Sequence, residues 1–242
     1  MKYQNKEGWL FVAPLLCWLA FSICVPLYIA IELSFFDIKI IGTEGKFVGF
    51  KNYIKTLNSS KFPKALTNSI YWVLANAVTQ TFFAFLIALT LNKHFKGVKI
   101  ATNWIILSFI IPTVVIVVIW KLMLSSSSGI INSLLVQLHI IDKPIGFFSS
   151  STSAFVSLVL INSWRWSPFL ALIILSGLKS IHQEIYDASK IDGAGFFAEF
   201  FQITLPQLKG VLFVLGLVGT LLSFNVFDII WLITKGGPSS AT

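Results

Sequence analysis

Charged side chains are scarce in this sequence, and their scarcity excludes most soluble folds. Of the 242 residues, 12% are charged and 56% are hydrophobic, and the mean hydropathy is +0.83. A soluble domain of this size carries roughly a quarter charged residues. The sequence therefore predicts an all-α integral membrane protein, because long apolar runs satisfy their backbone polar groups as helices.

Cysteine is also rare, and a nucleotide-binding loop is missing. The two cysteines, Cys17 and Cys24, lie in one apolar block with no histidine nearby, which favours packing over a disulfide or a metal site. No glycine-rich loop is followed by Lys and then Ser or Thr, the pattern that binds nucleotide phosphates. We therefore expect a chain that is not an enzyme and has no catalytic residue, metal or cofactor of its own.

Basic residues exceed acidic ones, giving a net charge of +8. They are scattered between apolar blocks rather than gathered in a patch. This distribution favours positions beside membrane lipids and argues against a nucleic-acid partner.

Five apolar runs are long enough to cross a bilayer of ~30 Å. They cover residues 8–33, 66–91, 100–124, 154–178 and 211–233 and form a single transmembrane domain over residues 1–242. The first run is longer than the apolar core of a signal peptide and has no small-x-small cleavage site, so we favour a retained span. Pro14 and Pro26 predict kinks in it, and Pro112 predicts a break in the third run.

Three long polar stretches and the short basic connector 93–99 separate the runs. Residues 35–64 have the composition of an exposed loop, and residues 125–153 form a second loop whose middle has helical spacing. The third stretch, residues 180–210, combines small residues with phenylalanines. Gly193 and Gly195 permit a sharp turn there, and Pro206 suits the first turn of a new helix, which predicts two short helices at a bend.

Lysine counts do not distinguish the two sides of the membrane, since each side would hold eight. Three lysines lie in the short connector 93–99, however, and short connectors weigh most in the positive-inside rule. We therefore expect a multi-pass chain with a cytoplasmic N-terminus. Residues 180–210 then lie in the cytoplasm.

The third stretch carries an ordered motif. Asp187, Ala188 and Ser189 are followed by Gly193 four residues after Ser189, and Ile203-x-Leu205-Pro206 closes the motif. This spacing resembles the EAA loop of the membrane subunits of bacterial ABC importers, with Asp in place of the usual Glu and Ser in place of Ala. The resemblance implies that the loop couples to an ATPase through Asp187, Ala188, Ser189, Asp192, Gly193, Ala194, Ile203, Leu205 and Pro206.

Further matches extend over essentially the whole chain and resemble the carbohydrate-uptake permeases. They are Asn68-Ser69, Asn92, Gly97, Pro112, Trp120, Gly129, Asn132, Phe227-Asp228 and Thr234-Lys235-Gly236-Gly237-Pro238, the last two resembling the MalF-type half of a permease pair. Thr102 departs from the family, which often has a basic residue there. The resemblance implies a type I importer permease with a six-helix core. Because this sequence has five apolar runs and no sixth, we expect a product truncated relative to the family.

The resemblance also implies the function and the partners. The chain would be the membrane subunit of an ATP-driven importer for a sugar or related polyol in the bacterial plasma (inner) membrane. Its partners would be a second permease subunit, two ATP-binding cassette ATPase subunits that consume the ATP, a periplasmic or lipid-anchored solute-binding protein, and membrane lipids.

The fourth run is interrupted by the polar and aromatic residues 162–169. Arg165 is costly in lipid, so we expect it to face protein, water or lipid headgroups. When the sequences are aligned on the coupling loop, the sugar-contacting positions of the maltose permease resemble Trp166, Phe169, Gly219 and Ser223, and Asn225 extends this predicted solute path. The alternative is that these residues form an aromatic interface belt and ordinary helix contacts.

Two other functions are compatible with the sequence. An ion-coupled secondary transporter would need acidic groups near the middle of the membrane, whereas Glu32 and Asp228 lie near predicted span ends and no inverted repeat is apparent. The other is a truncated permease remnant that no longer functions, which the missing sixth run keeps open.

Overall fold

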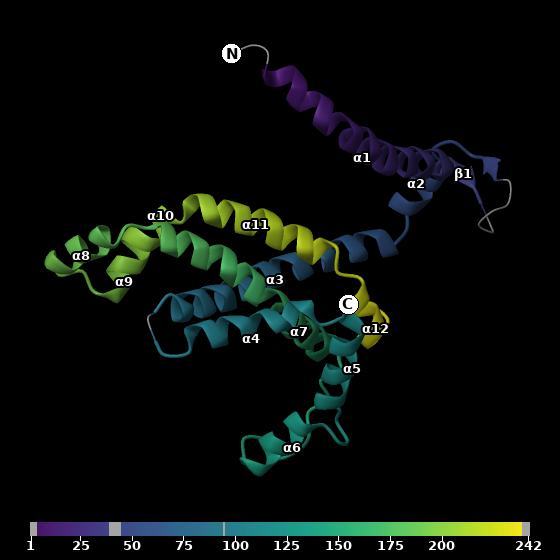
Figure 1. The fold of residues 1–242 in the computed structure, drawn as a ribbon. Helices are drawn as coiled ribbons and strands as arrows, with labels where there is room; N and C mark the ends of the chain where they lie inside the picture. The colour runs from purple at the N-terminus through teal and green to yellow at the C-terminus, as the bar shows by residue number, and fades with distance from the viewer. Residues whose placement is uncertain (1–3, 39–44, 94, 239–242) are drawn as a thin grey trace. The chain divides into compact units, whose positions relative to one another are not determined.

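The computed structural model describes residues 4–38, 45–93 and 95–238 of the chain. It divides into two compact units, residues 1–66 and residues 67–242 (Figure 1). Each unit is described by itself.

The first unit consists of a long helix followed by a small folded connector. Its elements are α1 (Gln4–Ser34), β1 (Phe36–Asp37), β2 (Lys46–Phe47), α2 (Lys51–Leu57) and the start of α3. The strands β1 and β2 pair in antiparallel orientation. Asn52 of α2 donates hydrogen bonds from Nδ2 to the carbonyl oxygens of Ser34 and Phe36, at 2.9 and 3.0 Å. The described parts of the expected loop 35–64 are therefore structured, whereas residues 39–44 lie outside the described residues. Strands of two residues are too short to give the alternation that predicts them.

The second unit contains most of α3 and all the helices that follow it. They are α3 (Lys61–Leu91), α4 (Val98–Ile110), α5 (Thr113–Met123), α6 (Ile130–Gln137), α7 (Ser151–Ser180), α8 (Gln183–Ile191), α9 (Phe196–Ala198), the π-helix η1 (Glu199–Thr204), α10 (Leu205–Gln207), α11 (Lys209–Phe224) and α12 (Asp228–Thr234). Helices α7 and α11 lie side by side, and α8, α9 and α10 gather at one end of this pair (Figure 1).

Within the described residues, three helices are long and apolar enough to cross a membrane, and the number rises to five if each bent helix pair counts as one span. The first bent pair, α4 and α5, turns by 98° at Pro112, where the sequence predicts a break. The second pair joins Phe196–Gln207 to α11 at an angle of 73°.

The predicted run 211–233 does not form one continuous helix, because α11 ends at Phe224 and α12 begins at Asp228. At this break the Asn225 side chain donates from Nδ2 to the carbonyl oxygen of Leu221, 3.0 Å away. Local side-chain hydrogen bonds of this kind compete with the helical pattern. The break and this contact were not expected from the sequence.

Two apolar clusters form the core of the second unit. The first cluster joins α3, α7 and α11 and consists of Ala84, Ala88, Leu91, Leu170, Ala171, Ile174, Leu175, Leu178, Leu208 and Leu215. The second cluster joins α3, α5, α7 and α12 through Trp72, Ile116, Val117, Leu124, Leu158, Val159, Ile161, Ile229 and Ile233. Along α3 and α7, buried polar residues separate the two clusters. The core is therefore layered: apolar, polar, apolar.

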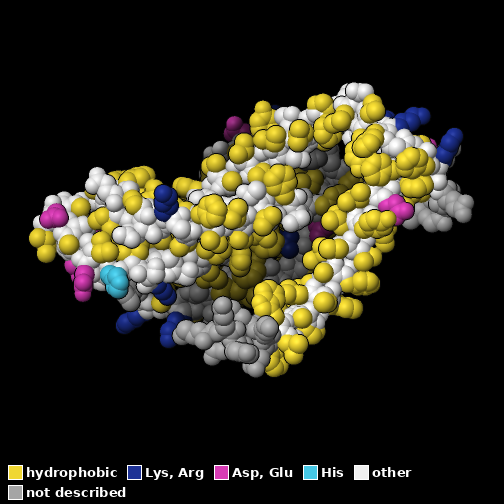
Figure 2. Space-filling model, turned by 90° about the horizontal axis from the view of Figure 1, so that it is seen from above, with side chains coloured by type: hydrophobic (Ala, Val, Ile, Leu, Met, Phe, Trp, Pro, Cys, Tyr) yellow, Lys and Arg dark blue, Asp and Glu magenta, His cyan; other side chains and the backbone are white. Residues whose placement is uncertain are grey.

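The surface of the second unit fits a lipid environment. In Figure 2, hydrophobic side chains are spread widely over its visible face, and charged side chains gather toward the end that carries α8. Large exposed apolar side chains such as Phe82, Phe213 and Leu217 occur along its long helices. An exposed apolar surface of this extent marks a membrane or protein contact.

Candidate coupling loop and solute path

The end of α8 is closed by a glycine in the left-handed conformation. Gly193 has a φ of +77°, and its N–H donates to the carbonyl oxygen of Lys190 at 3.1 Å. The N–H of Ala194 donates to the carbonyl oxygen of Ser189 at 2.9 Å. These two bonds form a Schellman motif, which stops a helix and turns the chain sharply. Gly193 thus makes the bend that the sequence predicts, because glycine has no β-carbon and adopts the left-handed conformation without steric cost.

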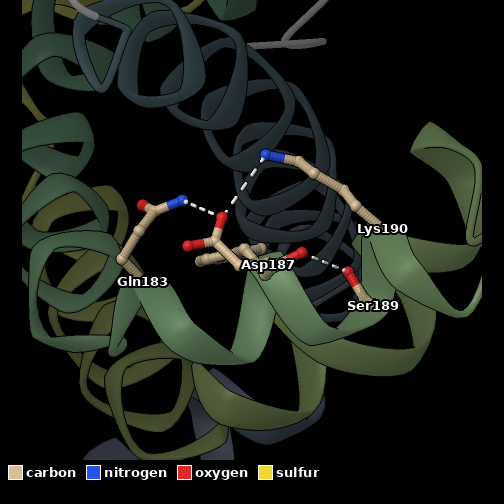
Figure 3. Close-up of polar contacts among 5 residues, drawn as sticks. Gln183, Asp187, Ser189 and Lys190 are labelled. Atoms are coloured by element: carbon tan, nitrogen blue, oxygen red, sulfur yellow. Dashed lines mark hydrogen bonds and ion pairs between the residues drawn. The ribbon is translucent and has the colours of Figure 1, made fainter.

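Asp187 is exposed on α8 and is held by its helical neighbours (Figure 3). Its Oδ1 accepts a hydrogen bond from Gln183 Nε2 at 3.2 Å and lies 3.9 Å from Lys190 Nζ. The ion pair is exposed on both sides, so it contributes little to stability. It does orient the carboxylate, which leaves the other oxygen, Oδ2, available to a partner.

The second half of the loop is fastened to the first and to α3. The hydroxyl groups of Tyr186 and Thr204 are hydrogen-bonded at 3.2 Å, which ties α8 to η1. The rings of Phe200 and Phe85 meet edge to face with centroids 5.6 Å apart. A π-helix is uncommon and often occurs at functional sites. These contacts make the loop a compact body rather than a flexible linker.

The predicted coupling residues divide into an outer and an inner group. Asp187, Ala188, Asp192, Gly193 and Pro206 are exposed, whereas Ala194, Ile203 and Leu205 are half-buried. Ser189 is buried and donates from Oγ to the carbonyl oxygen of Tyr186 at 2.8 Å. The outer group can meet a partner directly, while Ser189 can act only by shaping α8.

Three apolar side chains that the prediction did not include stand on the same loop surface. Ile191 is 87% exposed, Phe197 is 74% exposed and Phe196 is 64% exposed. Large apolar side chains with this exposure on a polar segment mark a contact surface. The helical spacing of the phenylalanines was visible in the sequence, but spacing alone could not tell which of them face outward.

The predicted solute-path residues fall into two groups. Trp166 and Phe169 are half-buried, with ring centroids 6.5 Å apart, and the Arg165 guanidinium lies 5.0 Å from the centre of the Trp166 ring. Gly219 and Ser223 are buried on α11. Asn225 is exposed beyond the end of α11, and its amide is used in the break described above.

The two groups lie at matching levels of neighbouring helices. A β-carbon on Gly219 would lie 3.8 Å from Cδ1 of Leu170, so these two residues face each other. Helices α7 and α11 run in opposite directions (Figure 1). One helical turn from this contact, Trp166 on α7 and Ser223 on α11 therefore come to the same level.

Several polar atoms at this level have no hydrogen-bond partner. Among the described residues, the buried side-chain atoms without one are Gln80 Oε1, Asn162 Oδ1, Arg165 Nε, Trp166 Nε1 and Ser223 Oγ. Each such atom costs about 1–3 kcal/mol when it stays unsatisfied. Groups of this kind call for a ligand or water. Gln80 was missed in the sequence, although carboxamides at positions 76 and 80 of an apolar run were the available signal.

A cavity of about 660 Å³ opens beside this level, between α3, α4 and α7. Its lining is mostly apolar, with Trp104, Trp164 and Pro168 among the residues and Ser108 and Ser167 supplying hydroxyl groups. Volumes of roughly 300–1,000 Å³ are usual for small-molecule sites. None of the predicted solute-path residues lines it, so the cavity and the predicted path use different faces of α7.

Comparison with known proteins gives the family. Residues 80–241 match the model of the binding-protein-dependent transport system inner membrane component. The chain is 33% identical to the trehalose/maltose transport system permease protein MalF of Thermococcus litoralis, covering 100% of this chain and 82% of the relative. It is 29% identical to the lactose transport system permease protein LacF of Rhizobium radiobacter, covering 100% of this chain and 81% of the relative.

A solved structure gives the fold. A chain of a bacterial ABC transporter that imports the acidic polysaccharide alginate superimposes with a TM-score of 0.80 at 22% identity, covering 98% of this chain and 81% of that chain. The expected type I permease architecture is therefore confirmed. The protein belongs to the family of binding-protein-dependent transport system inner membrane components.

Proposed function

We propose that this chain is a membrane-spanning subunit of an ATP-driven importer for sugars or related polyols, and that residues 180–210 receive the motion of the ATPase. The observation that carries the proposal is the compact loop built on Gly193, which presents Asp187 and Asp192 together with exposed apolar side chains. A rigid body of this kind can pass the closure of two ATPase subunits on to the spans as tilting.

The coupling function is divided between the two halves of the loop. Asp187 and Ile191 on α8 provide polar and apolar contacts for the ATPase. The bond between Tyr186 and Thr204 then transmits movement of α8 to η1, which continues through α10 into α11. In this arrangement the N-terminus and the coupling loop lie on the cytoplasmic side of the inner membrane.

The solute proposal rests on chemistry at the matching level of α7 and α11. Aromatic faces such as those of Trp166 and Phe169 stack on the apolar side of sugar rings. Unsatisfied polar atoms, including Ser223 Oγ, can bind sugar hydroxyl groups. The relatives named for trehalose/maltose and for lactose transport point to the same class of solute.

The partners follow from the same proposal. They are a second permease subunit, two ATPase subunits and an external solute-binding protein. One structural relative was solved in complex with a periplasmic protein that carries an alginate pentasaccharide, and its chain covers 98% of this one with a TM-score of 0.78. Glu32 and Asp228, the acidic residues considered for ion coupling, are both exposed, and no observation favours a secondary transporter.

Reconstitution tests the solute class. The chain is co-expressed with its partner permease and ATPase, placed in liposomes with the binding protein, and offered radiolabelled maltose, trehalose, lactose and histidine. We expect uptake of at least one sugar at least tenfold above its rate in liposomes without ATP, and no uptake of histidine. Import of histidine without import of any sugar would contradict the sugar assignment.

A further inference from the structure

Two carboxamides, Asn76 and Gln80, lie one helical turn apart in the middle of α3. Both side chains are completely buried, at 0% exposure, although α3 is long and apolar enough to cross a membrane. Polar side chains at that depth are expensive and commonly mark functional positions. Neither residue belongs to the predicted solute path or to the coupling loop.

The hydrogen bonds of Asn76 fix the orientation of two other amides. Asn76 Nδ2 donates to the carbonyl oxygen of Trp72 at 2.9 Å, so its Oδ1 faces the opposite way. That oxygen accepts from Gln80 Nε2 at 3.0 Å and from Asn162 Nδ2 at 2.7 Å. Because Gln80 and Asn162 both donate to Asn76 from their NH₂ groups, their side-chain oxygens point away from Asn76. Gln80 Oε1 and Asn162 Oδ1 are left buried and without partners.

In a buried network with only a packing role, every donor and acceptor would have a hydrogen-bond partner. The neighbouring hydroxyl pair of Thr79 and Ser163 does so, since the two oxygens are 2.6 Å apart and Thr79 Oγ1 also lies 2.7 Å from the carbonyl oxygen of Ala75. The amide network instead leaves two strong acceptors open. Open acceptors fit a ligand that supplies O–H donors.

The network is joined directly to the predicted solute path. Trp72, one turn before Asn76, donates from Nε1 to the carbonyl oxygen of Ser223 at 3.1 Å. Ser223 lies at the end of α11, just before the non-helical residues that separate α11 from α12. Irregular backbone at membrane depth is tolerated where it is packed in protein or lines a water-filled cavity. The network therefore lies where a path between α3, α7 and α11 would open.

The charges at this level fit an uncharged ligand. Arg165 is a cation near the midpoint of α7, and Asp228 at the start of α12 carries a charge of the opposite sign. The pair offers both signs, so it gives no net preference for an anion. Hydroxyl groups therefore suit the open acceptors better than a charged group does.

We propose that Gln80 is a specificity-determining residue whose Oε1 accepts a hydrogen bond from a hydroxyl group of an uncharged sugar when the path opens, and that Asn76 is its positioning residue. The inference rests on the proposed function, since it names a contact within the same path. Asn76 acts only through Gln80 and Asn162, whose amides it holds in one orientation.

The test uses the reconstituted complex with radiolabelled maltose and trehalose as probes. The solute-loaded binding protein is kept saturating, so that its own affinity does not enter. The measured quantity is the number of sugar molecules imported per ATP hydrolysed. The variant Gln80→Met keeps the size of the side chain but removes its acceptor. We expect it to lower this ratio about tenfold, which is the size expected for one lost hydrogen bond. The rate of ATP hydrolysis should stay within about twofold of the wild-type rate.

Two further variants separate specificity from packing. Thr79→Val removes a satisfied hydroxyl from the same helix and should lower thermal stability while leaving the ratio unchanged. Asn76→Leu should also lower the number of sugar molecules imported per ATP. The double variant Asn76→Leu/Gln80→Met should have the same ratio as the single variant with the lower ratio, because the effects of residues that act through one contact are not additive.

The possible failures are distinguishable. If the wild-type complex imports neither maltose, trehalose nor any other sugar, the proposed function fails and this inference with it. If the wild-type complex imports a probe and Gln80→Met keeps the wild-type ratio, the inference fails alone, whether or not the melting temperature of the variant falls.

Discussion

Gly193→Thr should reduce the amount of ATPase that co-purifies with the membrane complex about tenfold while leaving membrane insertion intact. Gly193 adopts a φ of +77°, and a branched side chain in that region is strained by about 1–2 kcal/mol. The strain is removed only if the Schellman motif opens. The exposed carboxylates of Asp187 and Asp192 then leave their present arrangement. A change of 1.4 kcal/mol corresponds to about a tenfold change in binding.

Gly195→Thr provides the matched control for this prediction. Gly195 is two residues away and, as at Gly193, no atom lies within 4 Å of an added β-carbon. Its φ of −78° is ordinary extended backbone, and Thr is favourable at this N-cap position of α9. We expect near wild-type recovery of the ATPase. Equal loss with both variants would show that contact with the added side chain matters, and not the backbone turn.

Gly177→Val should lower the melting temperature of the complex in detergent by about 5–10 °C. A β-carbon on Gly177 would lie 2.7 Å from both Leu208 Cδ2 and Val211 Cγ2. Helices α7 and α11 approach closely at this glycine, just before the chain enters the coupling loop. Overpacking of a buried contact costs about 1–3 kcal/mol, and each 1 kcal/mol shifts the midpoint by roughly 2–4 °C in a chain of this size.

The control for helix composition is Gly216→Val. Gly216 lies within α11, where an added β-carbon meets no atom within 4 Å. Because Val has a higher helix propensity than Gly, this variant should melt at or slightly above the wild-type temperature. The close-approach explanation fails if the two variants lose equal stability.

The features that were predicted correctly from the sequence have strong local causes. Pro112 lacks an N–H and stops α4, and the structure bends by 98° there. Gly193 is the residue that the left-handed end of α8 requires. The type I permease fold followed from the family resemblance carried by the ordered spacing of Asp187, Gly193 and Pro206, and the family match and the solved structure confirm it. The coupling role of residues 180–210 stays a prediction.

The features that were missed depend on contacts between helices or on short local hydrogen bonds. The break after Phe224 has neither proline nor glycine at 225–227, so the run 211–233 was expected to be continuous. The π-helix η1 has no sequence pattern distinct from that of an α-helix. Asn76 and Gln80 lie within an apolar run, and their importance depends on a contact between helices, the hydrogen bond that Asn162 of α7 donates to Asn76 of α3.

We propose that this membrane chain moves a solute only when its partner ATPase hydrolyses ATP. The most direct measurement compares sugar uptake by liposomes that contain the complete complex with uptake by the same complex carrying an ATPase subunit that binds but cannot hydrolyse ATP. We predict that uptake falls to the level of empty liposomes. Continued uptake with the inactive ATPase, driven by a proton or sodium gradient, would contradict the account.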